Sequence, residues 1–218
     1  MVADPEVLDN YLRSTGLPPT AVQREMADHA DREEFPIVGP TVGSLLCGMA
    51  VMIGARSVFE FGSGFGYSAS WFLRGMTEDG SIVLTEHDRD ELDLAKSFFE
   101  RSGDAGRVTF EHGDAIEIVD RYPGPFDIVL IDHEKSRYVD GFEAIRDKVA
   151  PGGVVVADNM MHGPFEFREI ADGVAGRSMS DGRVEGVVHY LDHVNNADGF
   201  VTSVVPLGSG IAVTVKRR

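Results

Sequence analysis

Apolar residues recur along the first part of this chain at helical spacing, set in a mostly polar background. Residues 4–34 follow this pattern, and Asp4 before a proline predicts the N-cap of the first helix. Pro18-Pro19-Thr20 then divides the stretch into two short helices. Their amphipathicity is modest, which favours a cover over a site or a partner surface.

A loop is predicted at 35–40, after which the pattern becomes uniformly apolar. Thr41 can cap a helix that runs to about residue 53 and is apolar enough to be buried. Cys47 lies in this helix and is expected to act as a small buried hydrophobic residue. It is the only cysteine, which excludes an internal disulfide and a cysteine-rich zinc site.

From residue 57 onward, short apolar runs typical of buried parallel strands alternate with segments of helical spacing. The predicted strands are 57–61, 81–86, 108–111, 128–131 and 154–157, and the predicted helices are 67–76, 88–102, 115–121 and about 137–149. This alternation predicts a doubly wound, mostly parallel sheet with helices on both faces.

The last third of the chain is less regular. Residues 160–182 are rich in glycine, methionine and phenylalanine, and they are predicted to form a mobile substrate lid with at most a short helix. Five apolar residues then recur at helical spacing and predict a helix in spite of the strand preference of valine: Val184, Val187, Val188, Leu191 and Val194. Runs at 200–206 and 211–216, joined by Leu207-Gly208-Ser209-Gly210, predict an antiparallel hairpin.

Length and charge narrow the class of protein. The 218 residues are expected to form a single domain, made of a helical cap (1–54), a core (55–159), the lid (160–182) and a C-terminal helix and hairpin (183–218). A formal charge of −16 argues against binding nucleic acid through a basic surface. With no long apolar run and no secretory signal, we expect no membrane contact and a cytoplasmic location. The acid excess and only four lysines fit either an ordinary acidic protein or a halophilic one.

Two neighbouring predicted strands each end in an acid. Asp132 follows the first, and Asp158 with Asn159 follows the second. Ligands of open parallel sheets bind at these carboxyl ends, and three oxygen ligands suit Mg²⁺. Lys135, three residues after Asp132, is placed to act on what the metal holds. The plainer alternatives are Asp132 paired with Arg137, Lys135 as a surface lysine, and Asp158-Asn159 as the start of a turn.

A glycine-rich segment, Glu60 to Ser68, follows the first strand and opens a helix. Its spacing is G-x-G-x-G with an acid two residues before the first glycine, the form found in adenosylmethionine sites; a glycine-rich turn of no special function is the alternative. Glu86 ends the second strand and can accept hydrogen bonds from ribose hydroxyls. Asp114 can meet an adenine amino group, cap a helix, or do both.

Taken in order, these motifs resemble the cation-dependent O-methyltransferases, the family of catechol and caffeoyl-CoA O-methyltransferases. The resemblance covers about residues 35–218, and the segment Asp132-His133-Glu134-Lys135-Ser136-Arg137-Tyr138 is similar to the catechol branch. It implies a Rossmann-like methyltransferase fold with seven strands and a C-terminal antiparallel hairpin.

The resemblance also implies site roles, with Lys135 as the catalytic general base and a metal ion held by Asp132, Asp158 and Asn159. The implied cofactor pocket for S-adenosylmethionine contains Glu60, Gly62, Gly64, Tyr67, Ser68, Glu86, Asp114 and Asp132.

The expected reaction is methyl transfer from S-adenosylmethionine to one hydroxyl of a small vicinal dihydroxy aromatic. A phenol ionises near pH 10, so a cation that binds both oxygens would favour the phenolate. The alternatives are a metal-independent small-molecule methyltransferase and a non-catalytic adenosylmethionine-binding module. A homodimer is expected from the resemblance. His189 and His193 share a helix face, but without a third ligand they are interpreted as solvated side chains rather than a zinc site.

Overall fold

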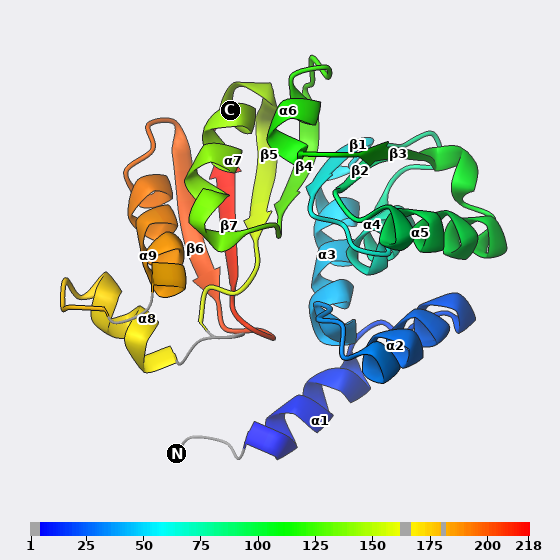
Figure 1. The fold of residues 1–218 in the computed structure, drawn as a ribbon, viewed down its shortest axis with the longest axis horizontal. Helices are drawn as coiled ribbons and strands as arrows, with labels where there is room; N and C mark the ends of the chain where they lie inside the picture. The colour runs from blue at the N-terminus through cyan, green and yellow to red at the C-terminus, as the bar shows by residue number, and fades with distance from the viewer. Residues whose placement is uncertain (1–4, 162–166, 180–181) are drawn as a thin grey trace.

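The computed structural model describes residues 5–161, 167–179 and 182–218. Its centre is one seven-stranded sheet in the order β3-β2-β1-β4-β5-β7-β6 (Figure 1). The first five strands are parallel, whereas β7 is antiparallel to both β5 and β6. The predicted mostly parallel sheet with a C-terminal antiparallel hairpin is therefore confirmed.

The strands are β1 (Ser57–Phe61), β2 (Ser81–Glu86), β3 (Val108–His112), β4 (Phe126–Ile131), β5 (Val149–Ala157), β6 (Phe200–Val205) and β7 (Ile211–Lys216). The helices are α1 (Pro5–Thr15), α2 (Ala21–Glu33), α3 (Gly39–Ile53), α4 (Tyr67–Gly75), α5 (Arg89–Ser102), α6 (Ala115–Val119), α7 (Tyr138–Ile145), α8 (Phe167–Val174) and α9 (Gly182–Asn195). Short 3-10 turns lie at Ala105–Arg107, Lys135–Arg137 and Arg146–Lys148.

Two hydrophobic clusters lie on opposite faces of the sheet. The first contains Leu46 of α3 and Trp71 of α4 with the inward side chains of β1 and β2. The second contains Phe142 of α7 and Tyr190 of α9, and both side chains are fully buried. Because successive strand residues point to opposite faces, each central strand contributes to both clusters.

Several local predictions need correction. Thr41 is not a cap, because α3 begins at Gly39 with Val38 before it and a proline in its first turn. The predicted helix at 137–149 is shorter, since α7 ends at Ile145 and β5 begins at Val149. The proposed cap Asp4 lies outside the described residues.

The segments that flank the core agree with the pattern of the sequence. The hydroxyl of Thr20 accepts a hydrogen bond from the Gln23 backbone N–H at 3.2 Å, and the Gln23 side chain caps Thr20 in return. Such a capping box fixes the start of α2. Figure 1 shows α1 extending away from the sheet, and it packs against α3. Within the predicted lid the structure contains α8, while residues 162–166 and 180–181 lie outside the description.

None of the described helices has the length and apolar character that crossing a membrane requires.

Candidate active site

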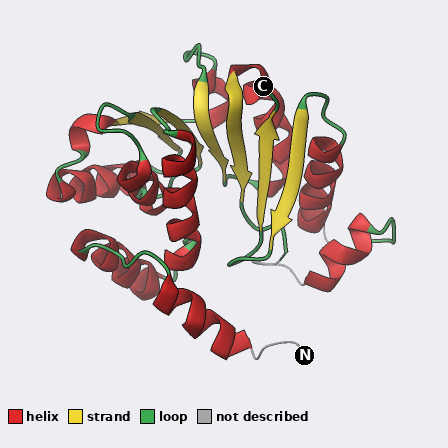
Figure 2. Cartoon of the chain, turned by 180° about the vertical axis from the view of Figure 1, so that it is seen from behind, coloured by secondary structure: helices red, strands yellow, loops and turns green. Residues whose placement is uncertain are grey.

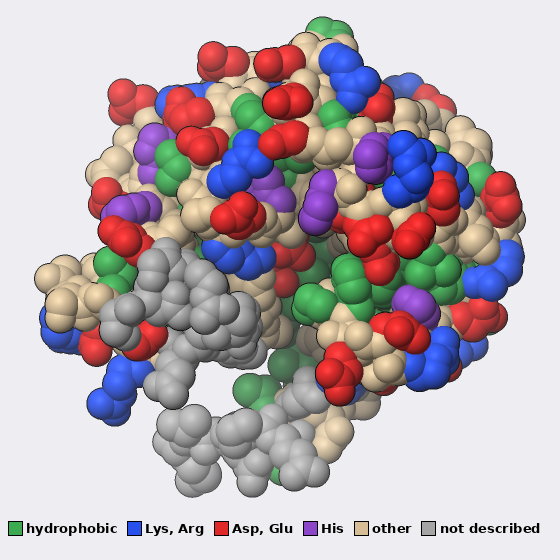
Figure 3. All heavy atoms as spheres, viewed as in Figure 1, with side chains coloured by type: hydrophobic (Ala, Val, Ile, Leu, Met, Phe, Trp, Pro, Cys, Tyr) green, Lys and Arg blue, Asp and Glu red, His purple; other side chains and the backbone are tan. Residues whose placement is uncertain are grey.

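A cavity of about 1110 Å³ opens at the carboxyl ends of β1, β2, β4 and β5. Figure 3 shows a hollow at this position, between the two halves of the molecule, and acidic side chains spread over the surrounding face. Glu60 is the one predicted site residue that does not line it, because it is buried behind Ser68, to which it is hydrogen-bonded. The others line the cavity: Gly62, Gly64, Tyr67, Ser68, Glu86, Asp114, Asp132, Lys135, Asp158 and Asn159. The fold therefore brings together residues that are up to a hundred positions apart.

The glycine-rich loop between β1 and α4 packs too tightly for side chains. A Cβ at Gly62 would lie 2.7 Å from the Asp132 carbonyl oxygen, and one at Gly64 would lie 2.7 Å from the Phe35 ring. Both glycines have positive φ, +77° and +48°, which L-residues rarely adopt. The loop thus presents bare backbone to the cavity, which lets a ligand approach closely.

Glu60 is a buried acid with an unpaired oxygen. Its side chain is fully buried, and Oε1 accepts a hydrogen bond from the Ser68 hydroxyl. Among the described residues, Oε2 has no hydrogen-bond partner. Burial raises the pKa of Glu60 to about 8, the Ser68 hydrogen bond opposes the rise, and the charge of Asp132 adds to it. A buried carboxylate without a partner is costly, so the ionised Glu60 side chain would be stabilised by a cationic ligand that pairs with it.

Glu86 ends β2 and is held by backbone donors. Its Oε2 accepts from Gly64 N–H at 2.9 Å, and its Oε1 accepts from the N–H groups of His87 and Asp88 at 2.8 and 2.9 Å. The carboxylate ties the glycine-rich loop to the end of β2. Glu86 lies on the cavity wall. That it accepts hydrogen bonds from ribose hydroxyls stays a prediction.

Asp114 is the N-cap of α6, as one of its two predicted roles required. Its Oδ1 accepts from the Ile116 N–H at 2.8 Å, and its Oδ2 pairs with Arg137 at 2.6 Å. The hydrogen bond from Arg137 holds the pKa of Asp114 below its ordinary value. The alternative pairing of Arg137 with Asp132 is therefore wrong.

Lys135 lies in the cavity and is not a solvated surface lysine. Its side chain is 17% exposed. Its Nζ donates to Asp132 Oδ1 at 2.8 Å and to the Tyr138 hydroxyl at 2.7 Å. Tyr138 is fully buried, and burial raises its pKa well above the ordinary value. The Lys135 Nζ is therefore fixed at one point beside the acid that follows β4.

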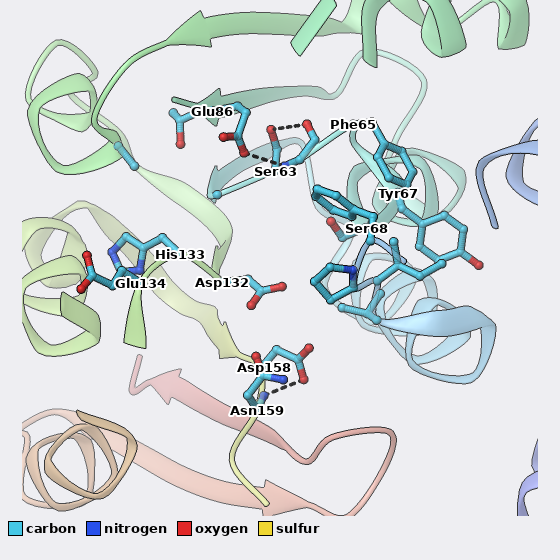
Figure 4. A pocket seen from close by; sticks show the side chains of 18 of the residues that line it. Ser63, Phe65, Tyr67, Ser68, Glu86, Asp132, His133, Glu134, Asp158 and Asn159 are labelled. Atoms are coloured by element: carbon cyan, nitrogen blue, oxygen red, sulfur yellow. Dashed lines mark hydrogen bonds between the residues drawn. The ribbon is translucent and has the colours of Figure 1, made fainter. Parts of the chain in front are cut away.

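Asp158 and Asn159 follow β5 next to this group (Figure 4). Asp158 is 4% exposed, and its Oδ1 accepts from Ser209 Oγ at 2.6 Å and from Asn159 N–H at 2.7 Å. Burial, followed by the charge of Asp132, raises the pKa of Asp158 to about 6. Asn159 has a left-handed φ of +66°, which asparagine tolerates better than most residues. Figure 4 shows Asp132 and Asp158 facing the same space.

Some site residues were not predicted from the sequence. Tyr138 and Ser209 fix Lys135 and Asp158, although the sequence signals only the motif and the hairpin that contain them. His133 lies between Phe61 and Tyr138, and burial, together with Arg137 and Lys135, lowers its pKa to about 4, so the imidazole is neutral. Arg13 and the loop 34–39 line the cavity from the N-terminal side.

The described part of the predicted lid does not line this cavity. Its role as a lid stays a prediction.

The two histidines of α9 differ from each other. His189 is 62% exposed beside Glu185, as expected. His193 is not simply solvated, because its Nε2 lies 2.6 Å from Glu143 Oε1 and its ring meets Phe142 edge-on. Across the described residues, no group of three or more His, Cys, Asp or Glu side chains is placed to hold a metal ion. The predicted metal ligands Asp132, Asp158 and Asn159 are not such a group, because one of the three is an amide.

Comparison with known proteins gives consistent matches. The chain matches the O-methyltransferase family over residues 22–217. It is 31% identical over 179 residues to a catechol O-methyltransferase of Mycobacterium tuberculosis, covering 80% of this chain and 81% of that protein. It is also 31% identical over 128 residues to a catechol O-methyltransferase of Niastella koreensis, covering 57% of this chain and 58% of that protein. The crystal structure of a Bacillus cereus O-methyltransferase in complex with SAH superposes with a TM-score of 0.85 at 25% identity, over 97% of each chain.

Proposed function

The chain belongs to the O-methyltransferase family, whose reaction uses S-adenosylmethionine, and from this premise we propose the acceptor and the metal. The acceptor is one hydroxyl of a small vicinal dihydroxy aromatic, and a divalent cation such as Mg²⁺ assists. The names of the two catechol O-methyltransferases support the acceptor class. The observation that carries the proposal is Lys135, held beside Asp132 in the cavity that the glycine-rich loop also lines.

The residues present fit a cation at the ends of β4 and β5. Asp132 and Asp158 are close enough for the first to raise the pKa of the second, and a bound cation would relieve that repulsion. Asp132, Asp158 and Asn159 would hold the ion through three oxygens, a ligand type that Mg²⁺ prefers. When bound, it would act as a Lewis acid that favours the ionised hydroxyl.

The fit to S-adenosylmethionine rests on Glu60 and the glycine-rich loop. The unpaired Oε2 of Glu60 suits the ammonium group of the methionine part. The backbone at Gly62 and Gly64, which is packed too tightly for a Cβ, would let the cofactor approach the loop closely. Glu86 and Asp114, at the ends of the next two strands, supply acceptors for ribose hydroxyls and an adenine amino group.

Lys135 would take the proton of the attacking hydroxyl. A neutral amine has two N–H donors and one lone pair. The hydrogen bonds to Asp132 and Tyr138 use both donors, which leaves the lone pair for the incoming proton. The hydroxyl oxygen forms a bond to the methyl carbon as the carbon–sulfur bond breaks, giving a methyl ether and adenosylhomocysteine. Alignment of oxygen, carbon and sulfur supplies the rest of the rate enhancement.

The test is a turnover screen with a labelled methyl group. We expect labelled product from catechols, with flavonoids and acyl-CoA esters as comparison substrates, and loss of product on adding chelator. Full activity in chelator would indicate a metal-independent methyltransferase. Cofactor binding by calorimetry without turnover on any substrate would indicate a binding module, and NADH must not bind.

We also propose that the acid excess adapts the chain to concentrated salt. The formal charge is −16, and self-repulsion of that size weakens as salt shortens the screening length. Thermal melts from low to multimolar KCl should show a steadily rising melting temperature. A melting temperature that does not respond to salt would contradict the proposal.

A further inference from the structure

Helix α9 lies beside the turn that carries Lys135 and beside α7, which follows that turn. Figure 2 shows α7 and α9 on the same face of the sheet, behind β5, β7 and β6. Three residues of α9 contact these neighbours: Gly186, Tyr190 and His193. They recur at i, i+4 and i+7, so they form one stripe along the helix. None of the α9 residues that the structure describes lines the cavity, so this helix acts on the site through its neighbours.

Gly186 lets α9 pack directly on the backbone of the turn. A Cβ there would lie 2.5 Å from the Lys135 carbonyl oxygen and 3.0 Å from the Ser136 Cα. The three nearest atoms all belong to the backbone, so no side chain can rotate out of the way. The same carbonyl accepts the hydrogen bond from the Tyr138 N–H, which joins the turn to α7. A glycine inside a helix is less favourable than alanine, and this close contact accounts for its presence.

Tyr190 supports the other end of Lys135. Its side chain is fully buried, and its ring meets the Tyr138 ring edge-on, with the centroids 5.5 Å apart. The Tyr138 hydroxyl in turn accepts a hydrogen bond from the Lys135 Nζ at 2.7 Å. Helix α9 therefore constrains both ends of the lysine: the backbone carbonyl through Gly186, and the amine through the two tyrosines.

Helix α9 is itself held in place by the second hydrophobic cluster. Five of its side chains lie in that cluster and are at most 7% exposed: Val184, Val187, Val188, Leu191 and Val194. Protein interiors are closely packed, so α9 cannot move outward without opening this core. A methyl group added at Gly186 would therefore displace the turn rather than the helix. The Lys135 carbonyl would have to move by about 1 Å to restore ordinary van der Waals contact.

We propose that Gly186 and Tyr190 are positioning residues for Lys135, so that α9 sets where its amine stands relative to the attacking hydroxyl. This inference rests on the proposed role of Lys135 as general base. A proton acceptor works only within hydrogen-bond reach of the proton that it removes. A displacement of about 1 Å, caused by a change far from the chemistry, is enough to lower a rate by about 10²-fold.

The first test compares Gly186→Ala with the wild type in the labelled-methyl assay, with catechol as acceptor and Mg²⁺ present. We expect kcat to fall by about 10²-fold, while the KM for catechol and the Kd for S-adenosylmethionine stay unchanged. In the Lys135→Ala background the same change should cost no further turnover, because both changes remove one function. The matched control is Gly48→Ala, at an interior glycine of α3 whose Cβ would have no neighbour within 4 Å. It should keep the wild-type kcat.

The second test reads the position of the turn without any turnover. In NMR spectra of the ligand-free protein, Gly186→Ala should shift the amide signals of Lys135 to Tyr138 and leave those of the glycine-rich loop unchanged. Tyr190→Leu, which removes the ring that supports Tyr138, should also lower kcat, by about 10-fold, again with unchanged cofactor affinity. It tests the proposal independently if Gly186→Ala does not fold.

A wild-type kcat in Gly186→Ala, or amide signals that do not move, would overturn the proposal. So would a loss as large in the Lys135→Ala background as in the wild type, because α9 would then act on something other than Lys135. Failure of the proposed function gives a different result, in which catechol is not turned over or Lys135→Ala keeps near-normal turnover. The amide shifts still report in that case whether α9 sets the position of the turn.

Discussion

The proposed cofactor half and the proposed acceptor half of the cavity are built differently. The cofactor half comes mainly from one continuous stretch, Glu60 to Ser68, with Glu86 at the end of the adjacent strand. Its two acids are nearly or fully buried, and one is bound by three backbone N–H groups. The acceptor half brings together residues that follow β4 and β5 with one from the hairpin turn. Apart from the hydrogen bond from Asn159 N–H to Asp158, its polar contacts are mainly between side chains.

This difference suggests that cofactor binding and catalysis can be lost independently of each other. Backbone donors and glycines persist when a side chain of the acceptor half is changed, so cofactor binding should survive such a change. The acceptor half depends on side chains that hold one another across long sequence separations, so single substitutions there should abolish chemistry while leaving cofactor binding intact.

The largest effect is expected for Asp158→Ala. Loss of this carboxylate should weaken metal binding and abolish turnover, because the hydroxyl would no longer be activated. Calorimetry should show that S-adenosylmethionine still binds. Asp140→Ala, which removes an exposed acid of α7, is the control and should retain activity. Loss of cofactor binding in Asp158→Ala would show that the two halves are not separable.

Lys135→Ala should lower turnover by about 10²–10⁴-fold, the usual range for a general base, with metal and cofactor still bound. The deficit should shrink as pH rises, because the substrate hydroxyl then ionises unaided. Lys135→Arg should not restore activity, since arginine does not release its proton. Lys96→Ala, at a lysine of α5, serves as the control. Near-normal turnover of Lys135→Ala at pH 7 would rule out Lys135 as the general base.

Glu60→Gln tests the cofactor half and should weaken S-adenosylmethionine binding by about 10–100-fold, the range for a charge-assisted hydrogen bond. Its carboxyl has a pKa of about 8 in the folded protein, against an ordinary 4.5. A cationic ligand favours the ionised form, so wild-type affinity should rise with pH toward 8. Calorimetry in buffers of different ionisation enthalpy should detect the proton release, and Glu60→Gln should lose it.

Glu60 also makes the stability of the ligand-free protein depend on pH. As pH rises, stability should fall, whereas affinity for the cofactor should rise. Because the folded state keeps the proton to about pH 8 and the unfolded chain loses it near 4.5, the contribution of Glu60 to stability falls as pH rises through that window. The melting temperature of Glu60→Gln should therefore fall less with rising pH than that of the wild type. If the difference between the two melting temperatures does not change with pH, the raised pKa of Glu60 is contradicted.

The smallest effect is expected at Asp114, whose pairing with Arg137 joins the two halves. Asp114→Ala removes a helix cap worth about 0.5–2 kcal/mol. That should lower the melting temperature by about 2–4 °C per kcal/mol for a chain of this size. Asp114→Asn keeps the cap and loses only a partly exposed ion pair, worth about 1 kcal/mol or less. Equal melting temperatures for both variants would contradict the capping role.

Much of the fold follows from local pattern. The boundaries of β1, β2 and β7 agree with the predicted runs, because each run is a contiguous apolar segment between polar turns. The start of α3 was not predictable in the same way. The sequence offers Thr41 as a conventional cap, but the helix begins at Gly39, and the buried Thr41 hydroxyl has no hydrogen-bond partner among the described residues.

The candidate residues of the site were also visible in the sequence, since acids and glycines that follow buried strands lie at the carboxyl edge of the sheet, where ligands bind. Their partners were not. Arg137 lies five residues after Asp132 but pairs with Asp114, because the turn at Lys135–Arg137 directs it toward the start of α6. Ser209 reaches Asp158 from 51 positions away.

By itself, therefore, the sequence determined the order of strands and helices and the positions of the polar residues at the strand ends. Local apolar periodicity encodes which side of each element is buried, and that information is complete within a few residues. Only the tertiary structure decided which side chains pair and which part of the sheet stays uncovered. Both depend on how separate elements align in space: Gly208 of the hairpin turn lies against Val42 of α3, and Figure 2 shows no described helix in front of β7 and β6.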